Sequence, residues 1–376
     1  MLNRRETLKL LGVTGLASAA ASGLASDAAS PAVAGDSSAK LQASASGNTV
    51  SRILFGSCAH QDKEQPIWGP INALEPDLFI MLGDNIYGDT RDMKLLSSKY
   101  QKLADKPGFK ELRGRTPLIA TWDDHDYGEN DAGYDYPMKE QSKELFLDFF
   151  EEPEDSPRRR KDDGIYTSYM YGEGDTAVQV ILLDLRWNRT PISHVSAKEA
   201  KRRDQMGFGP YVPLLDPSST ILGEKQWQWL EAELQKPARL RVIGSSLQFI
   251  STFPGWEAWS LFPRERQRLI SLIDQTQADG VVFISGDTHW AEISCQTEKC
   301  PYPLYDFTSS GLTETWHNMS PNVYRLPGCL YTEANFGVIE IDWTVPDPHI
   351  VLQARDVNGR PIFEKSILLS QLAAQR

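Results

Sequence analysis

The chain has 376 residues, of which 40% are hydrophobic and 24% are charged, and its formal net charge is −12. The excess of carboxylates argues against a nucleic acid or an anionic membrane as the partner, because either would need a broad basic surface. Phosphorylated small molecules remain allowed, because bound cations can supply the positive field that the protein itself lacks. The length is sufficient for one large α/β domain or two smaller ones.

The first fifty residues have the pattern of an export signal followed by a linker. Asn3 to Leu10 form a twin-arginine start, a modest apolar run extends to Leu24, and Ala32-Val33-Ala34 is a small-x-small cleavage site. The run is short and rich in small residues, so it is a poor membrane span; a disordered N-terminus with two chance arginines is the alternative. We expect a twin-arginine signal peptide at 1–34, a flexible linker at 35–50 and a folded domain at 51–376. The protein would then pass through the twin-arginine export machinery to the periplasm or the medium, without stable membrane insertion.

Strands and helices alternate in the first part of the folded domain. Apolar runs and helical periodicity predict strands at 52–56, 77–82 and 117–121, and helices at 65–74, 92–103 (ended by Pro107 and Gly108) and 139–150. This βαβαβ order implies a parallel sheet with right-handed crossovers. Residues 151–161, which include four consecutive basic residues, are expected to form a solvated loop.

The second part begins with a predicted antiparallel hairpin and ends in strands. Residues 186–219 between them show no clear period and are expected to be an irregular insertion, a kind of segment that is often functional. The expected elements are strands at 164–171, 177–185, 240–245, 281–285, 290–294, 305–308, 336–343, 350–355 and 361–367, and helices at 223–235 and 263–275. Two mixed sheets flanked by helices, a four-layer αββα sandwich, fit this order better than a single doubly wound sheet.

Four of the predicted strands end in residues that bind metals, and in open α/β sheets the chemistry lies just past such ends. The thiolate, phenolate and imidazole of Cys58, Tyr87 and His289 suit Fe(III). The oxygen donors suit hard cations such as Ca²⁺ or Mn²⁺, and they are Asp84, Asp124, Asn130 and Asp287. Asp84 stands between the two sets and could bridge two metals. A bridged pair would make a hydroxide nucleophile from water and neutralise phosphate oxygens.

These motifs resemble those of the PhoD-like alkaline phosphatase family in the calcineurin-like metallophosphatase superfamily. The resemblance covers about residues 51–307 and rests on Gly56-Ser57-Cys58, Gly83 to Tyr87, Trp122 to Asp126 with Asn130, Leu183 to Arg186, and Ser285 to His289. It implies an αββα metallophosphatase domain that hydrolyses phosphate esters with Fe(3+) and Ca(2+), although Mn, Zn or Mg could fill the second site. By position, Cys58, Asp84, Tyr87 and His289 would hold the iron. Asp84, Asn130 and Asp287 would face calcium, with Asp124 a ligand or a neighbour of the ligands.

The remaining candidate residues have alternative interpretations. His60 could be a ligand, a substrate contact or a neighbour of the ligands. Arg186 could bind two phosphate oxygens, or it could form a salt bridge to Asp184 or a nearby site carboxylate. His125 could protonate the leaving alkoxide, or it could orient a ligand carboxylate.

Three cysteines remain once Cys58 is assigned to a metal. In an oxidising compartment Cys295 and Cys300 could form a bridge, with Cys329 as the competing partner.

The expected function is an exported phosphomonoesterase that uses a metal-activated hydroxide on a small phosphate ester. A phosphodiesterase or phospholipase D-like activity on phospholipids or cell-wall polymers would use the same site. A non-catalytic, metal-stabilised extracellular binding protein and an iron redox enzyme are the alternatives from other classes. The oligomeric state is not indicated by the sequence.

Overall fold

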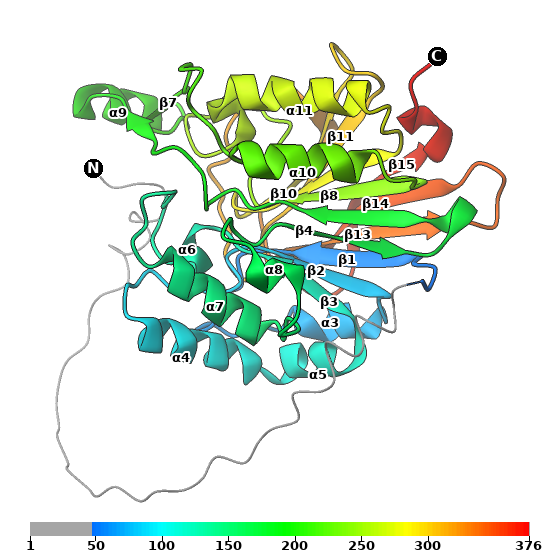
Figure 1. Ribbon diagram of the computed structural model, residues 1–376, viewed down its shortest axis with the longest axis horizontal. Helices are drawn as coiled ribbons and strands as arrows, with labels where there is room; N and C mark the ends of the chain where they lie inside the picture. Colours follow the sequence, from blue (N-terminus) through cyan, green and yellow to red (C-terminus); the bar gives the residue numbers. More distant parts are fainter. Residues whose placement is uncertain (1–46, 376) are drawn as a thin grey trace, which may run out of the picture.

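The structure is a computed structural model that describes residues 47–375. The predicted signal peptide, its cleavage site and most of the linker therefore lie outside the described residues. Two mixed sheets pack face to face, and helices cover both outer faces (Figure 1). The predicted four-layer αββα sandwich is confirmed.

The first sheet has six strands in the order β15-β14-β13-β1-β2-β3. Strands β1, β2 and β3 run parallel to one another, as the βαβαβ order predicts, and β13 pairs with β1 in the antiparallel direction. The strands are β1 Arg52–Gly56, β2 Leu78–Leu82, β3 Leu118–Thr121, β13 Asn335–Asp342, β14 His349–Asp356 and β15 Pro361–Leu368.

The second sheet has seven strands in the order β12-β10-β11-β9-β8-β5-β4. Its middle strands β11, β9, β8 and β5 are parallel, and β4 forms the predicted antiparallel hairpin with β5. The strands are β4 Thr167–Tyr171, β5 Val178–Leu182, β8 Leu240–Ser245, β9 Val281–Ser285, β10 Ala291–Gln296, β11 Leu304–Ser309 and β12 Arg325–Tyr331.

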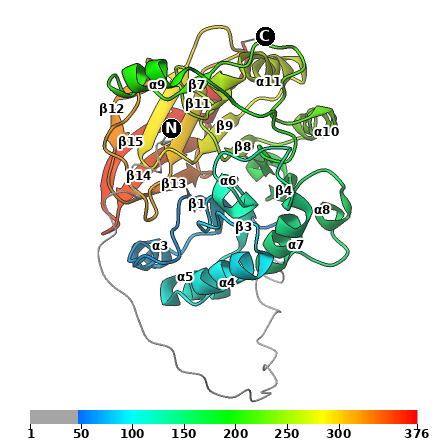
Figure 2. The ribbon, with the colours of Figure 1, turned by 90° about the vertical axis from the view of Figure 1, so that its left-hand side faces the viewer.

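Helices form the two outer layers. Helices α3, α4, α5 and α7 lie over the first sheet, and α10 and α11 lie over the second (Figures 1 and 2). The helices are α3 Trp68–Ala73, α4 Met93–Ala104, α5 Pro107–Arg115, α6 Asp124–Tyr127, α7 Lys139–Phe149, α8 Pro157–Arg160, α9 Ala197–Asp204, α10 Glu224–Leu234 and α11 Pro263–Gln275, with short 3₁₀ turns at Gly174–Thr176, Trp259–Leu261 and Leu369–Leu372. No helix in the described part of the chain is long and apolar enough to cross a membrane.

Strand β2 shows why the central strands read as continuous apolar runs. Leu78, Ile80 and Leu82 pack in the core between the two sheets. Phe79 and Met81 pack in the core between the first sheet and the helices that cover it. Both faces of the strand are therefore buried. Full burial of each such side chain contributes about 1.5–3 kcal/mol.

Two local predictions in the first half are corrected. Pro107 begins α5 rather than only ending the preceding helix, because proline fits the first turn of a helix. Residues 151–161 are not simply a solvated loop, because they include α8 and because Arg158 is 3% exposed. Its guanidinium donates to the backbone carbonyls of Ile165 (2.5 Å) and Ala120 (2.6 Å).

Three further corrections concern the second half. The insertion at 186–219 is ordered in part, since it contains α9 and a small hairpin of β6 (Ser193–His194) and β7 (Tyr211–Val212). Strand β12 was not predicted because it contains Pro327 and Gly328, and these are tolerated because β12 is an edge strand. The possible bridge between Cys295 and Cys300 is not formed, since all four cysteines are free thiols.

Candidate metal centre

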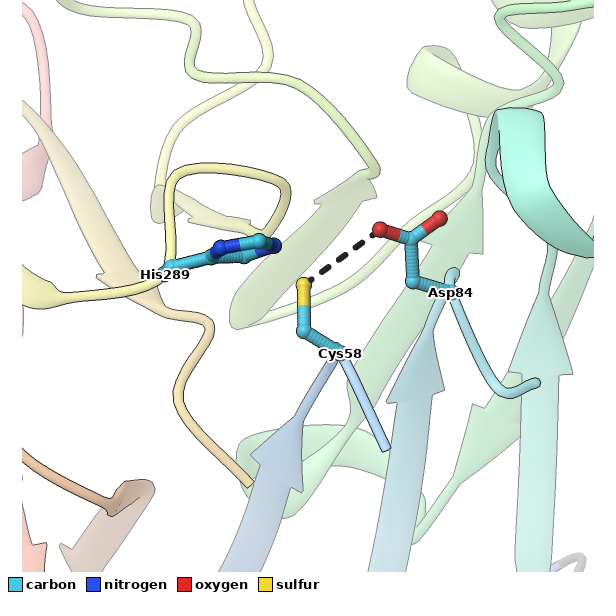
Figure 3. Close-up of side chains that lie close together, drawn as sticks. All are labelled: Cys58, Asp84 and His289. Carbon is cyan, nitrogen blue, oxygen red and sulfur yellow. Dashed lines mark hydrogen bonds between the residues drawn. The ribbon is translucent and has the colours of Figure 1, made fainter. Parts of the chain in front are cut away.

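The ends of β1 and β2 and the loop after β9 bring the first candidate ligands together. Figure 3 shows Cys58, Asp84 and His289 converging from these segments. Cys58 Sγ lies 3.5 Å from Asp84 Oδ2, and the backbone N–H groups of Cys58 and Ala59 donate to the carbonyls of Gly83 and Asp84. All three side chains are buried.

Asp84 belongs to three groups of candidate ligand atoms, and within each group all the atoms lie within 4.8 Å of one another. The first group pairs it with Cys58 and His289, and the second with Asp124 and His125. The third contains Asp123 and Asp287. Asp84 thus connects the thiolate and imidazole set with the carboxylate set, which is the arrangement that a bridging ligand requires.

Four of the candidate ligands have unusual backbone conformations. The φ angles of Cys58, Asp84, Asp287 and His289 are 64°, 49°, 67° and 66°, in the left-handed region that non-glycine residues rarely adopt. Such conformations cost about 1–3 kcal/mol each and persist only where surrounding structure imposes them. They turn the chain sharply at the strand ends, and their clustering points to a functional site.

Asp126 ties the turn at Asp84 to the segment that follows β3. Its carboxylate accepts hydrogen bonds from the backbone of Asp84 (3.2 Å) and Asp123 (2.7 Å), and also from the side chain of Asn85 (2.5 Å). Burial raises the pKa of Asp126 to about 7, against the lowering effect of these hydrogen bonds. A side chain at Gly83 could not be accommodated, because its Cβ would lie 2.5 Å from Asp123 Cβ.

The aromatic candidates lie side by side next to this cluster. Tyr87 Oη is 3.1 Å from His289 Nε2, and the Tyr87 ring lies 4.8 Å from that of His60 and 4.2 Å from that of His125. Burial lowers the pKa of His60, and its Nδ1 accepts a hydrogen bond from the backbone of Asp62. Among residues 47–375, no group of ligand atoms includes His60, so a neighbouring role fits it better than ligation.

His125 has a partner that the sequence analysis did not identify. Its Nδ1 lies 2.7 Å from Asp89 Oδ1, while its buried Nε2 has no hydrogen-bond partner in the described structure. The carboxylate fixes the orientation of the ring. This arrangement leaves one ring nitrogen for proton transfer.

Arg186 is completely buried and binds carboxylates of the protein itself. Its guanidinium contacts Asp123 Oδ1 through Nε (2.6 Å) and holds both oxygens of Glu257 (2.8 and 3.0 Å). The same guanidinium lies 3.9 Å from Asp124. Of the two alternatives for Arg186, this geometry favours the salt bridge to a site carboxylate over contact with phosphate.

The loop after α6 carries Asn130, the remaining predicted oxygen ligand. The backbone N–H of Asp131 donates to Asp124 Oδ2 at 2.7 Å, which ties this loop to the cluster. Asp124, Asp131 and Glu257 form a further group of ligand atoms. Of these, Asp131 and Glu257 were missed by the sequence analysis, because neither follows a predicted strand. Asp123 lay within a recognised motif, but it received no role.

The donor set fits the metals that the resemblance implies. Cys58, His289 and the neighbouring phenol of Tyr87 could hold iron, and Asp84, Asp124, Asp287 and Asn130 could hold a hard cation. The assignment of individual ligands remains a prediction.

Comparisons with known proteins identify the family of the chain. A family model described as PhoD-like phosphatase matches residues 97–317. Alkaline phosphatase D of Bacillus subtilis (strain 168) is 24% identical over 216 residues, a match that covers 52% of this chain and 35% of that protein. The chain thus spans about a third of the length of this curated relative. The solved structure of PhoD matches with a TM-score of 0.61 at 16% identity, covering 86% of this chain and 73% of that one, which supports the fold alone.

Proposed function

The chain belongs to the PhoD-like phosphatase family, and we propose that it is an exported, metal-dependent hydrolase of phosphate esters. The observation that carries this proposal is the position of Asp84 in three groups of ligand atoms. One group is rich in nitrogen and sulfur and suits iron, and another is rich in oxygen and suits calcium. Export rests on the twin-arginine pattern of the N-terminus alone.

The residues of the chain have distinct roles in the proposed reaction. Cys58, Asp84 and Asp124 are among the residues that would hold a pair of cations, and the bound cations would lower the pKa of a water molecule and neutralise phosphate oxygens. Asp84 sets the spacing of the two halves of the site, and Asp126 holds the turns that present Asp84 and Asp123. His125, oriented by Asp89, donates a proton from Nε2 to the leaving alkoxide.

A phosphodiesterase is the second candidate function, and the state of Arg186 favours it. A monoester carries a second negative charge that a phosphodiester lacks, and in one of its two interpretations Arg186 would have helped to bind that charge. Its guanidinium is instead held by Asp123 and Glu257 and has no exposed surface. The site therefore lacks the guanidinium that would have favoured a dianionic monoester over a phosphodiester.

The ratio of two specificity constants tests the proposal. Protein with confirmed metal content would be assayed with an aryl phosphate monoester and with the matching bis-aryl diester. A higher kcat/KM for the monoester would support a phosphomonoesterase, and a higher value for the diester would support the second candidate. Hydrolysis of neither ester by the metal-loaded protein would contradict both and favour a binding protein.

A further inference from the structure

The loop that carries Asn130 is held from outside by side chains of the insertion. The backbone carbonyl of Asp131 accepts a hydrogen bond from Arg189 Nη2, and the side-chain carboxylate of Asp131 accepts one from Tyr211 Oη. The Ala132 carbonyl accepts a third from Arg186 Nη1 at 3.5 Å. Asp131 has a φ angle of 56°, a conformation that persists only when surrounding contacts impose it.

Glu257 in turn holds both arginines. Its carboxylate forms a two-point contact with Arg186 at 2.8 and 3.0 Å, and it lies 3.2 Å from Arg189 Nη1. Both guanidinium groups are fully buried, and Glu257 is only 5% exposed. A buried guanidinium needs a compensating charge, and Glu257 is the carboxylate that both arginines share.

We propose that Glu257 is a positioning residue for the oxygen-rich half of the metal centre. By fixing Arg186 and Arg189 it holds the loop that bears Asn130 against Asp124, and it thereby sets the affinity for the hard cation. This inference rests on the proposed function, in which Asn130 and Asp124 face that cation. The contacts of Arg186 and Arg189 described here reach Asp123, Asp131 and Ala132. These belong to the oxygen-rich half, so we expect the iron half to be insensitive to Glu257.

Replacing Glu257 by glutamine tests this role with little change in volume. The amide keeps one acceptor oxygen but loses the charge, and its NH2 group would face an N–H of a guanidinium instead of accepting from it. Changes to groups that orient metal ligands typically cost 10- to 100-fold in metal affinity. We expect Glu257→Gln to weaken calcium binding to the iron-loaded protein by about that factor, with unchanged iron content and visible absorption. Added calcium should restore kcat.

A matched control separates this effect from general destabilisation. Glu233 is similarly buried, at 6% exposure, and its carboxylate accepts from Ser168 and Gln179 and pairs with Lys236, away from the site. Calorimetric titration of calcium into Glu233→Gln should give the wild-type affinity. Wild-type calcium affinity in Glu257→Gln, or equal loss of iron and calcium, would overturn the inference.

Direct ligation of the cation by Glu257 is the competing explanation, because its oxygen lies within 4.8 Å of those of Asp124 and Asp131. Positioning predicts that Arg189→Met and the milder Tyr211→Phe also weaken calcium binding, although both keep Glu257. Unchanged affinity in both variants would overturn the positioning role. Asn130→Ala serves as the test of the underlying site, because wild-type calcium affinity there would contradict the proposed ligand set rather than the role of Glu257.

Discussion

Replacing Arg186 by methionine distinguishes a buried structural ion pair from a phosphate-binding residue. Arg186 is fully buried, and its removal would leave the carboxylates of Asp123 and Glu257 without their main counter-charge at 1% and 5% exposure. Removing one partner from a buried pair costs about 3–5 kcal/mol, because the other charge stays buried and uncompensated. This is a large part of the 5–15 kcal/mol that stabilises a typical domain.

Urea unfolding of the metal-free protein measures this cost without any contribution from bound cations. We expect the free energy of unfolding of Arg186→Met to fall by about 3–5 kcal/mol. The matched control is Arg115→Met, which removes a half-exposed pair with Glu111 and should change stability by less than about 1 kcal/mol. An unchanged free energy of unfolding together with a raised KM for a monoester would refute the structural role and restore the phosphate-binding one.

Four further predictions follow from the site and its surroundings. Asp84→Asn should abolish both metal retention and hydrolysis, and a fully active variant would exclude the bridging role. Cys58→Ser should lose iron in preference to calcium, as measured by elemental analysis; unchanged iron content would show that the thiolate is not a ligand. His125→Asn should slow hydrolysis of alkyl esters far more than that of nitrophenyl esters, because only a poor leaving group needs a proton, and equal losses would argue for a purely orienting role. Burial raises the pKa of Asp306 from 3.8 to about 6, so the folded state holds this proton more tightly, and roughly 3 kcal/mol of stability present below pH 4 is lost as the pH rises through 6. Asp306→Asn should therefore gain stability relative to the wild type between pH 4 and 7, and a constant difference across that range would contradict the assignment.

The helices and strands that the sequence predicted well share a strong local signal. Strands β1 and β9 and helix α11 have the predicted bounds, Arg52–Gly56, Val281–Ser285 and Pro263–Gln275. Each is an apolar or periodic run bounded by turn residues, so its conformation follows from neighbours along the chain. Helix α9, by contrast, has no buried residue, and an exposed helix lacks the apolar stripe by which periodicity is recognised.

The residues of the candidate site also differ in whether a local sequence signal marks them. Cys58, Asp84, Asp287 and His289 could be named in advance because each directly follows a buried strand, and parallel strands bring their carboxyl ends to one edge. Glu257 could not be named, because it follows no strand, and it reaches Arg186 across 71 residues of chain.

The types of metal-binding residue, the parallel order of the first strands and the layered architecture could all be predicted from the sequence. These depend on short-range periodicity and on the chemistry of single side chains. Three further contacts became visible only in the folded chain: Arg186 binds Asp123 and Glu257, Asp89 orients His125, and the insertion holds the loop of Asn130. The physical reason is that these contacts join loops far apart in the chain, and their partners are selected by the way the two sheets pack rather than by any local pattern.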